Sequence, residues 1–298
     1  MHGVEGIASA VRAGEISATE IIADHLQRID RSRLNAFNSV DEEGATAAAL
    51  AIDVRVRRGE DPGKLAGVPL AVKDLIDQAG LVNTAGSSFY RKTPDTTAIS
   101  LRRLVEQGAI PIGRTGLHEF AFGFSSENHW FGPVLNPWNP STSPGGSSGG
   151  SGAAVAAGLV PVALGTDTGG SVRVPAALCG IVGLKVTHGR IPISGVFPLA
   201  PSLDTVGPIT RSVADAAVLY SLMVGGDDSD PWSTFSEPAP IGPPSSPDGL
   251  RVGIPRAWIE EAPMTEGVAS AFEWITRELN ACGVHLQTVD LPEFGSSS

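Results

Sequence analysis

Two glycine-rich stretches decide how this chain is interpreted: Pro144–Gly152, PGGSSGGSG, and Gly165–Ser171, GTDTGGS. Each surrounds a serine with glycine, and the two serines, Ser147 and Ser171, are 24 residues apart. Glycine lets the backbone approach a ligand closely and adopt conformations that a Cβ disfavours. A serine in such a loop has an accessible hydroxyl with free backbone N–H groups beside it. These are a nucleophile and an oxyanion hole, the two parts that acyl transfer requires.

The residues between the two stretches argue against a linker. A Gly/Ser tract alone is typical of a flexible linker. Here it continues into the helix-forming run Ala153–Ala157 and then into Leu159–Leu164, an apolar run that predicts a buried strand. No Lys-Ser or Lys-Thr follows the glycines, and no Gly-x-Gly-x-x-Gly opens a helix here, so phosphate-binding loops are disfavoured. The pattern predicts a helix–strand unit that carries exposed serines.

Serine is a weak nucleophile and needs a base. Around Ser171 there is no Gly-x-Ser-x-Gly elbow, and none of the four lysines follows a serine by three residues. Lys73 ends the apolar run Val68–Val72, which predicts an interior strand, so burial should lower the pKa of its amine. A pairing of Lys73 with Asp74 is the structural alternative. Any of the six histidines remains open as a base: His2, His25, His118, His129, His188 and His285.

Together, Lys73 and the two glycine-wrapped serines resemble the amidase signature family. The resemblance runs from the N-terminal helices to about Leu291. It implies a Ser–cis-Ser–Lys triad of Ser171, Ser147 and Lys73, with a cis Gly146–Ser147 peptide bond. Ser148 is the neighbouring candidate for the bridging serine, but the spacing that the family favours indicates Ser147. Further matching positions are Arg173, Pro175–Ala176, Cys179–Gly180, Gly183–Lys185, Gly189–Arg190 and Leu203–Pro208.

The resemblance also implies a mechanism. Neutral Lys73 accepts a proton relayed through Ser147, and Ser171 attacks an amide carbonyl. Backbone N–H groups of Thr168, Gly169, Gly170 and Ser171 form the oxyanion hole, and such donors are worth about 3–4 kcal/mol each in a transition state. Ammonia or an amine leaves, and water hydrolyses the acyl-enzyme. No metal or organic cofactor is required.

Composition agrees with an enzyme that works in the cytoplasm. The 298 residues are 42% hydrophobic and 18% charged, with a net charge of −11 and no Lys/Arg block. A nucleic-acid or anionic-membrane surface is therefore not expected. Cys179 and Cys282 are the two cysteines and suggest neither a disulfide framework nor a metal cluster. No signal peptide is evident, and no apolar run approaches the ~20 residues that span a bilayer.

The order of patterns predicts an α/β fold. Residues 1–60 are predicted to be helical, with a capping box at Ser17–Glu20. Residues 61–230 alternate strands, including Ala109–Ile112, with helices and form the catalytic core. A helix opening at Ser212–Asp215 is expected to bury Val213, Ala217 and Leu222 or their neighbours. The family resemblance implies one mixed central sheet flanked by helices.

The last part of the chain is expected to be incomplete. Residues 231–249 are a Pro/Ser-rich connection, and 250–298 begin the C-terminal part of the same domain. Strands are predicted at Leu250–Ile254 and Val284–Val289, with a helix at Glu266–Leu279 between them. Family members normally continue beyond this point, so the chain is expected to be truncated at its C-terminus and to lack part of the substrate pocket.

Three interpretations of function remain open. The first is an amidase that acts on a small carboxamide. The second is a glutamine-hydrolysing component, the so-called A subunit, of a tRNA-dependent amidotransferase, which works with partner subunits; Leu117–Gly123 and Glu127–Gly132 resemble both branches. The third is an inactive fragment. The first allows a homodimer, and neither of the first two requires direct contact with nucleic acid or membrane.

Overall fold

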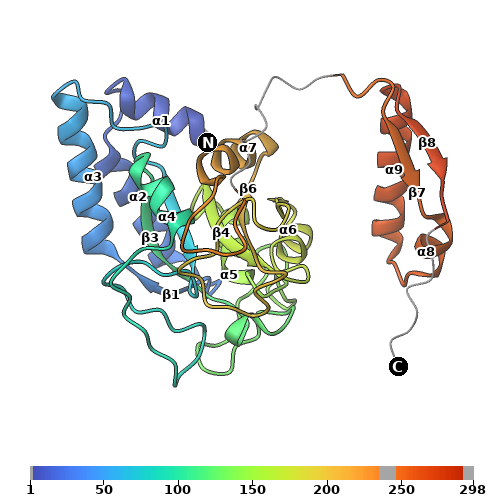
Figure 1. Ribbon diagram of the computed structural model, residues 1–298, viewed down its shortest axis with the longest axis horizontal. Helices are drawn as coiled ribbons and strands as arrows, with labels where there is room; N and C mark the ends of the chain where they lie inside the picture. The colour runs from blue at the N-terminus through green and yellow to red at the C-terminus, as the bar shows by residue number, and fades with distance from the viewer. Residues whose placement is uncertain (1–2, 235–245, 291–298) are drawn as a thin grey trace. The chain divides into compact units, whose positions relative to one another are not determined.

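The computed structural model describes residues 3–234 and 246–290 of this chain (Figure 1). It divides into two compact units, Met1–Ile241 and Gly242–Ser298, and each is described on its own. No helix in the described part of the chain is long and apolar enough to cross a membrane.

The first unit is built on a six-stranded sheet that is mixed, as the family resemblance implies. β2 is central and runs parallel to β3 on one side and to β4 on the other, whereas β6 pairs with β4 in the antiparallel direction. Strands β2, β3, β4 and β6 are buried along their whole length, because helices cover both faces. In sheet order the strands are β1 (Phe37–Val40), β3 (Ile110–Thr115), β2 (Pro69–Lys73), β4 (Val162–Asp167), β6 (Thr205–Thr210) and β5 (Val182–Gly183).

Alternating side chains of β2 and β4 divide the core between the two faces of the sheet. Leu70 and Val72 of β2 join a cluster with residues of α4 and α7, whereas Ala71 joins a cluster with α2, α3 and α5. The predicted capping box at Ser17–Glu20 opens α2. The helices are α1 (Val4–Arg12), α2 (Ala18–Arg31), α3 (Glu42–Arg57), α4 (Ile99–Glu106), α5 (Gly149–Ala156), α6 (Arg173–Cys179) and α7 (Val213–Met223), with a 3-10 turn at Glu119–Ala121.

Two details differ from the sequence-based prediction. Residues 1–60 are not helical throughout, because Phe37–Val40 forms the edge strand β1 against β3. Four residues with Asn and Ser between the apolar ends carry too little pattern to predict a strand. In α7, Val213 is 73% exposed, and Ala216, Leu219 and Met223 are buried instead. Val213 occupies the first helical position after the Ser212 cap, so the buried face begins one turn later.

The second unit is smaller. β7 (Arg251–Ile254) and β8 (His285–Thr288) form a two-stranded parallel sheet, joined by α8 (Arg256–Glu261) and α9 (Glu266–Ala281). Both predicted strands and the helix from Glu266 are confirmed. The expected Pro/Ser-rich connection lies mostly outside the described residues. Whether residues 250–298 belong to the same domain as the core stays a prediction.

The two sheets should differ in their resistance to local opening. Buried central strands exchange their amides only on global unfolding, whereas two-stranded sheets are marginally stable. Hydrogen exchange followed by mass spectrometry should show amides of β4 protected at least ~100-fold more than those of β8. Equal protection of the two strands would contradict this picture of the second unit.

Candidate active site

Parallel pairing brings the key residues to one edge of the sheet. Lys73 is the last residue of β2, and the loop that carries Ser171 follows β4. Leu70, Ala71 and Val72 pair in register with Val162, Ala163 and Leu164. Because parallel strands end at the same edge, Lys73 and the Gly165–Ser171 stretch lie together, where open α/β sheets usually bind ligands.

Lys73 is fully buried, and its amine has two partners. Its Nζ donates to Ser147 Oγ at 2.7 Å and to Thr166 Oγ1 at 2.8 Å. Burial lowers the pKa of Lys73 to about 7, although the carboxylates of Asp167 and Asp204 act to raise it. Half of the lysine is therefore neutral near neutral pH, as a general base requires.

Asp74 is not the partner of Lys73. Its carboxylate pairs with the buried Arg114, whose Nε lies 3.5 Å away, and accepts hydrogen bonds from Asn38 and Thr84. The structural alternative for Lys73, an ion pair with its sequence neighbour, is wrong because these groups already surround Asp74.

The two adjacent serines have different partners. Ser147 Oγ lies against Lys73, whereas Ser148 Oγ donates to the carbonyl of Thr166 at 3.2 Å and accepts from its N–H at 3.3 Å. Ser148 thus fastens the loop to β4, and Ser147 is the serine available to Lys73. The Gly146–Ser147 peptide bond is cis, as the family resemblance implies. Gly146 has no room for a side chain, because a Cβ would come within 2.8 Å of the backbone of residues 124–126.

Ser171 faces a cavity of about 320 Å³. The residue is 3% exposed, and its hydroxyl has no hydrogen-bond partner among the described residues. Its carbonyl accepts the N–H of Ser148 at 3.2 Å, which ties the two serine loops together. The rest of the lining carries no charged side chain: Ala121, Phe122, Gly123, Phe124, Thr168, Gly169 and Leu199.

The loop that forms one wall of this cavity is strained. Phe120, Ala121 and Ser126 have φ of 52°, 60° and 54°, a left-handed backbone conformation that residues other than glycine rarely adopt. Such strain persists where surrounding contacts impose it, and it clusters at functional sites. The periodicities of 3.6 and 2 residues that indicate helices and strands carry no information about backbone strain, so the sequence does not predict this wall.

One of the four N–H groups expected to form an oxyanion hole is already used within the fold. The N–H of Gly170 donates to the Asp167 carboxylate at 2.8 Å, so it is already engaged. Within residues 3–234 and 246–290, no acceptor is bound to the N–H groups of Thr168, Gly169 or Ser171. Three of the four expected donors are therefore available, and Gly170, with φ of 142°, instead allows the turn that presents them.

Asp167 organises this turn, and the sequence prediction overlooked it. Its carboxylate accepts from the side chain of Arg173 at 2.9 and 3.0 Å and from the N–H groups of Val172 and Gly170. Burial alone would raise the pKa of Asp167, but the bonds from Arg173 and the backbone outweigh burial and hold it below its usual value. Thr166, the second partner of Lys73, was also missed, although both residues lie inside the quoted GTDTGGS stretch.

A family model described as Amidase matches residues 20–297. The chain belongs to the amidase family. Within the described residues, no three His, Cys, Asp or Glu side chains gather as a metal site would require.

Curated relatives of this family member carry the name of the A subunit of glutamyl-tRNA(Gln) amidotransferase. The one from Chlorobaculum tepidum is 42% identical over 98% of the chain and 62% of its own length. The one from Chloroflexus aurantiacus is 44% identical over 95% of the chain and 59% of its own length. The chain thus spans about 60% of the length of the curated relatives it matches.

Solved structures resemble the whole described fold. The peptide amidase from Stenotrophomonas maltophilia is 35% identical, with a TM-score of 0.89 over 99% of this chain and 63% of its own. A chain of a vestigial protein complex that reveals the evolutionary origins of an s-triazine catabolic enzyme is 39% identical. Its TM-score is also 0.89, over 96% of this chain and 64% of its own.

Replacing Lys73 should change how stability depends on pH. The pKa of Lys73 is about 7 in the fold but near 10.4 when unfolded, so between these values the unfolded chain binds more protons. Wild-type stability should therefore rise with pH in this window, by at most about 1.4 kcal/mol per pH unit. Lys73→Met should lack this rise in urea unfolding, while Lys64→Met, at an exposed position, should retain it. Parallel pH profiles for wild type and Lys73→Met would contradict the burial of a titrating amine.

Replacing Asp167 should destabilise the loop that carries Ser171. Asp167→Asn removes the ion pair with Arg173 and should cost about 1–3 kcal/mol of unfolding free energy at pH 7. Because the pKa of Asp167 is depressed in the fold, this difference should persist above pH 4 and fade in stronger acid. Urea unfolding measures it, with Asp228→Asn at an exposed position as control. An Asp167→Asn variant as stable as this control would refute the organising role.

Proposed function

We propose that this chain hydrolyses a carboxamide C–N bond through an acyl-enzyme on Ser171. The observation that carries the proposal is the buried Lys73 amine, 2.7 Å from Ser147 Oγ and with a pKa of about 7. A lysine kept half neutral inside a protein is costly to stability, and such perturbed groups cluster at catalytic sites.

The proposed reaction begins with proton transfer. The distance of 2.7 Å between Lys73 Nζ and Ser147 Oγ suits transfer in either direction. Ser147 gives its proton to the neutral amine and takes one from Ser171, whose oxygen forms a bond to the carbonyl carbon of the substrate. Thr166, bonded to the same amine at 2.8 Å, keeps Nζ oriented toward Ser147.

Bond cleavage follows from the tetrahedral intermediate. Its oxyanion would be held by the N–H groups of Thr168, Gly169 and Ser171. The C–N bond breaks as the proton on Lys73 returns through Ser147 to the leaving nitrogen, which departs as ammonia or an amine. Water then attacks the ester on Ser171 by the same relay, and the carboxylic acid leaves with Ser171 restored.

The described lining of the cavity is mainly apolar. Among the described residues around Ser171, Phe122, Phe124 and Leu199 provide apolar surface that would contact the acyl group of a carboxamide.

The second candidate rests on the relatives. Curated proteins 42–44% identical to this chain are named as the A subunit of glutamyl-tRNA(Gln) amidotransferase. In that case the substrate would be glutamine, and partner subunits would receive the ammonia. Glutaminase activity that appears only with such partners would favour this candidate.

Amide turnover tests the proposal. Ammonia release from a panel of small carboxamides, with glutamine included, should fall at least ~1000-fold in Ser171→Ala. Ser88→Ala, at an exposed serine, should match wild type. Mass spectrometry of trapped substrate should locate the acyl group on the peptide that contains Ser171. An adduct on Ser147 or Ser148 would overturn the assignment, and a chain that neither releases ammonia nor forms an adduct would be an inactive fragment.

A further inference from the structure

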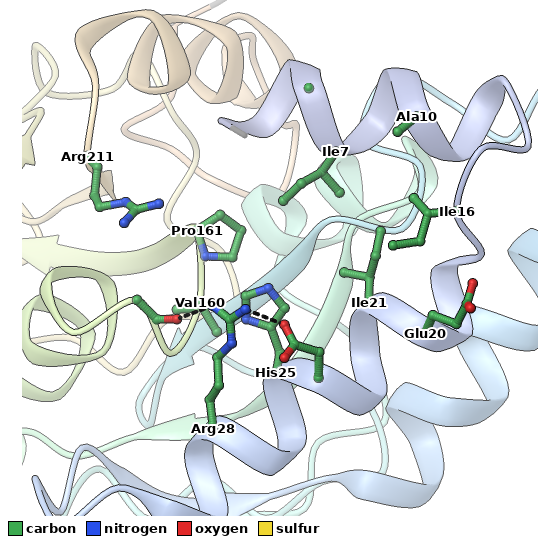
Figure 2. A pocket seen from close by; sticks show the side chains of 13 residues that line it. Ile7, Ala10, Ile16, Glu20, Ile21, His25, Arg28, Val160, Pro161 and Arg211 are labelled. Carbon is green, nitrogen blue, oxygen red and sulfur yellow. Dashed lines mark hydrogen bonds and ion pairs between the residues drawn. The ribbon is translucent and has the colours of Figure 1, made fainter. Parts of the chain in front are cut away.

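A second cavity, of about 260 Å³, lies at the other end of β4 from Ser171 (Figure 2). It is lined by residues of α1 and α2, by the turn that leads into β4 and by Arg211 before α7. Ser171 follows the last residue of β4, Asp167, whereas this cavity includes Val160 and Pro161, which precede its first residue. The walls are mainly aliphatic: Ile7, Ala10, Ile16, Ile21, Val160 and Pro161.

His25 is the buried titratable group that lines this cavity. It is 6% exposed, and its Nδ1 lies 2.7 Å from the carbonyl of Leu159. Because a carbonyl only accepts, Nδ1 carries the proton in the neutral ring and Nε2 keeps a lone pair. Burial lowers the pKa of His25 below its usual value, and the nearby cations Arg28 and Arg211 act in the same direction, although the hydrogen bond to the Leu159 carbonyl and the Asp24 carboxylate act to raise it. The ring is therefore neutral at pH 7.

Nε2 of His25 is an unused acceptor. No described residue donates to it, and it is not sealed away from the cavity that the ring lines. Because Nε2 is open to the cavity, a donor on a ligand bound there would replace water as its partner.

The charges at the mouth are already used in the fold. Arg28 forms an ion pair with Asp24 and donates to the carbonyl of Gly158 at 3.3 Å, as the dashed lines in Figure 2 show. Glu20 belongs to the capping box of Ser17. Arg211 also lines the cavity, so its two basic and two acidic side chains balance in charge. With apolar walls and a neutral acceptor at His25, the cavity suits a neutral ligand.

We propose that this cavity binds a small neutral aromatic molecule that carries one N–H or O–H donor. The ring would pack against Ile7, Ile21 and Val160, and the donor would meet Nε2 of His25. A dry apolar cavity of roughly 150 Å³ accepts benzene, so a volume of about 260 Å³ suits a bicyclic ring of the size of indole.

Indole and benzofuran form the test pair, because they have nearly the same shape but only indole has a donor. Calorimetry with the 298-residue chain should show saturable binding of both, with indole roughly three- to tenfold tighter. The ¹⁵N chemical shift of Nε2 in His25 should change on addition of indole. Absence of saturable binding, equal affinity for the two probes or an unchanged shift would overturn the proposal.

Variants on α1 locate the site. Ala10→Phe should fill the cavity and abolish binding of both probes, whereas Ser9→Phe, at the exposed preceding residue, should bind as wild type does. His25→Leu should retain benzofuran but lose the preference for indole. If His25→Leu fails to fold, the comparison of Ala10→Phe with Ser9→Phe, together with the Nε2 shift, still tests the proposal. Binding that survives Ala10→Phe would show that the probes bind at another site and would overturn the proposal.

Discussion

The arrangement of the rest of the site depends on the burial of one amine, that of Lys73. Lys73 ends the central strand β2, with no access to water, and its Nζ depends on the hydroxyls of Ser147 and Thr166. In this position the charged form loses its hydration, and the pKa falls to about 7. A parallel sheet covered on both faces is what makes such burial achievable. The fold thus accepts a loss of stability at Lys73, and the amine is partly neutral near pH 7, as the proposed base must be.

The two serine loops are held around this amine by different means. The Ser148 hydroxyl donates to the carbonyl of Thr166, and its N–H donates to the carbonyl of Ser171, so Ser148 ties the two loops to each other. On the other side, Asp167 gathers Arg173 and the N–H of Gly170. The Asp167 carboxylate, which shapes the turn, also favours the charged form of Lys73. Its ion pair with Arg173 weakens this effect on Lys73. Structure and electrostatics at Asp167 are therefore coupled.

Much of this site could be predicted from the sequence, because the patterns that indicate it are local. An apolar run that ends in lysine predicted β2, and Ser17–Glu20 predicted the start of α2. What it could not predict depends on tertiary contacts. The edge strand β1 has only four residues, Val213 is exposed because of where the cap places it, and the engagement of Gly170 follows from the orientation of a neighbouring carboxylate. His25, one of six equivalent candidates in the sequence, is identified as an acceptor only by its contact with Leu159, 134 residues away.

The central claim is that a neutral Lys73 activates Ser171 through Ser147. The most direct measurement is the rate at which a fluorophosphonate phosphonylates Ser171 as a function of pH, because it requires the nucleophile and not the whole substrate pocket. The rate should rise with pH with a midpoint near 7, and it should lose this profile and nearly all of its magnitude in Lys73→Met and in Ser147→Ala. A Lys73→Met variant that keeps the rate and the pH profile of wild type would contradict the account.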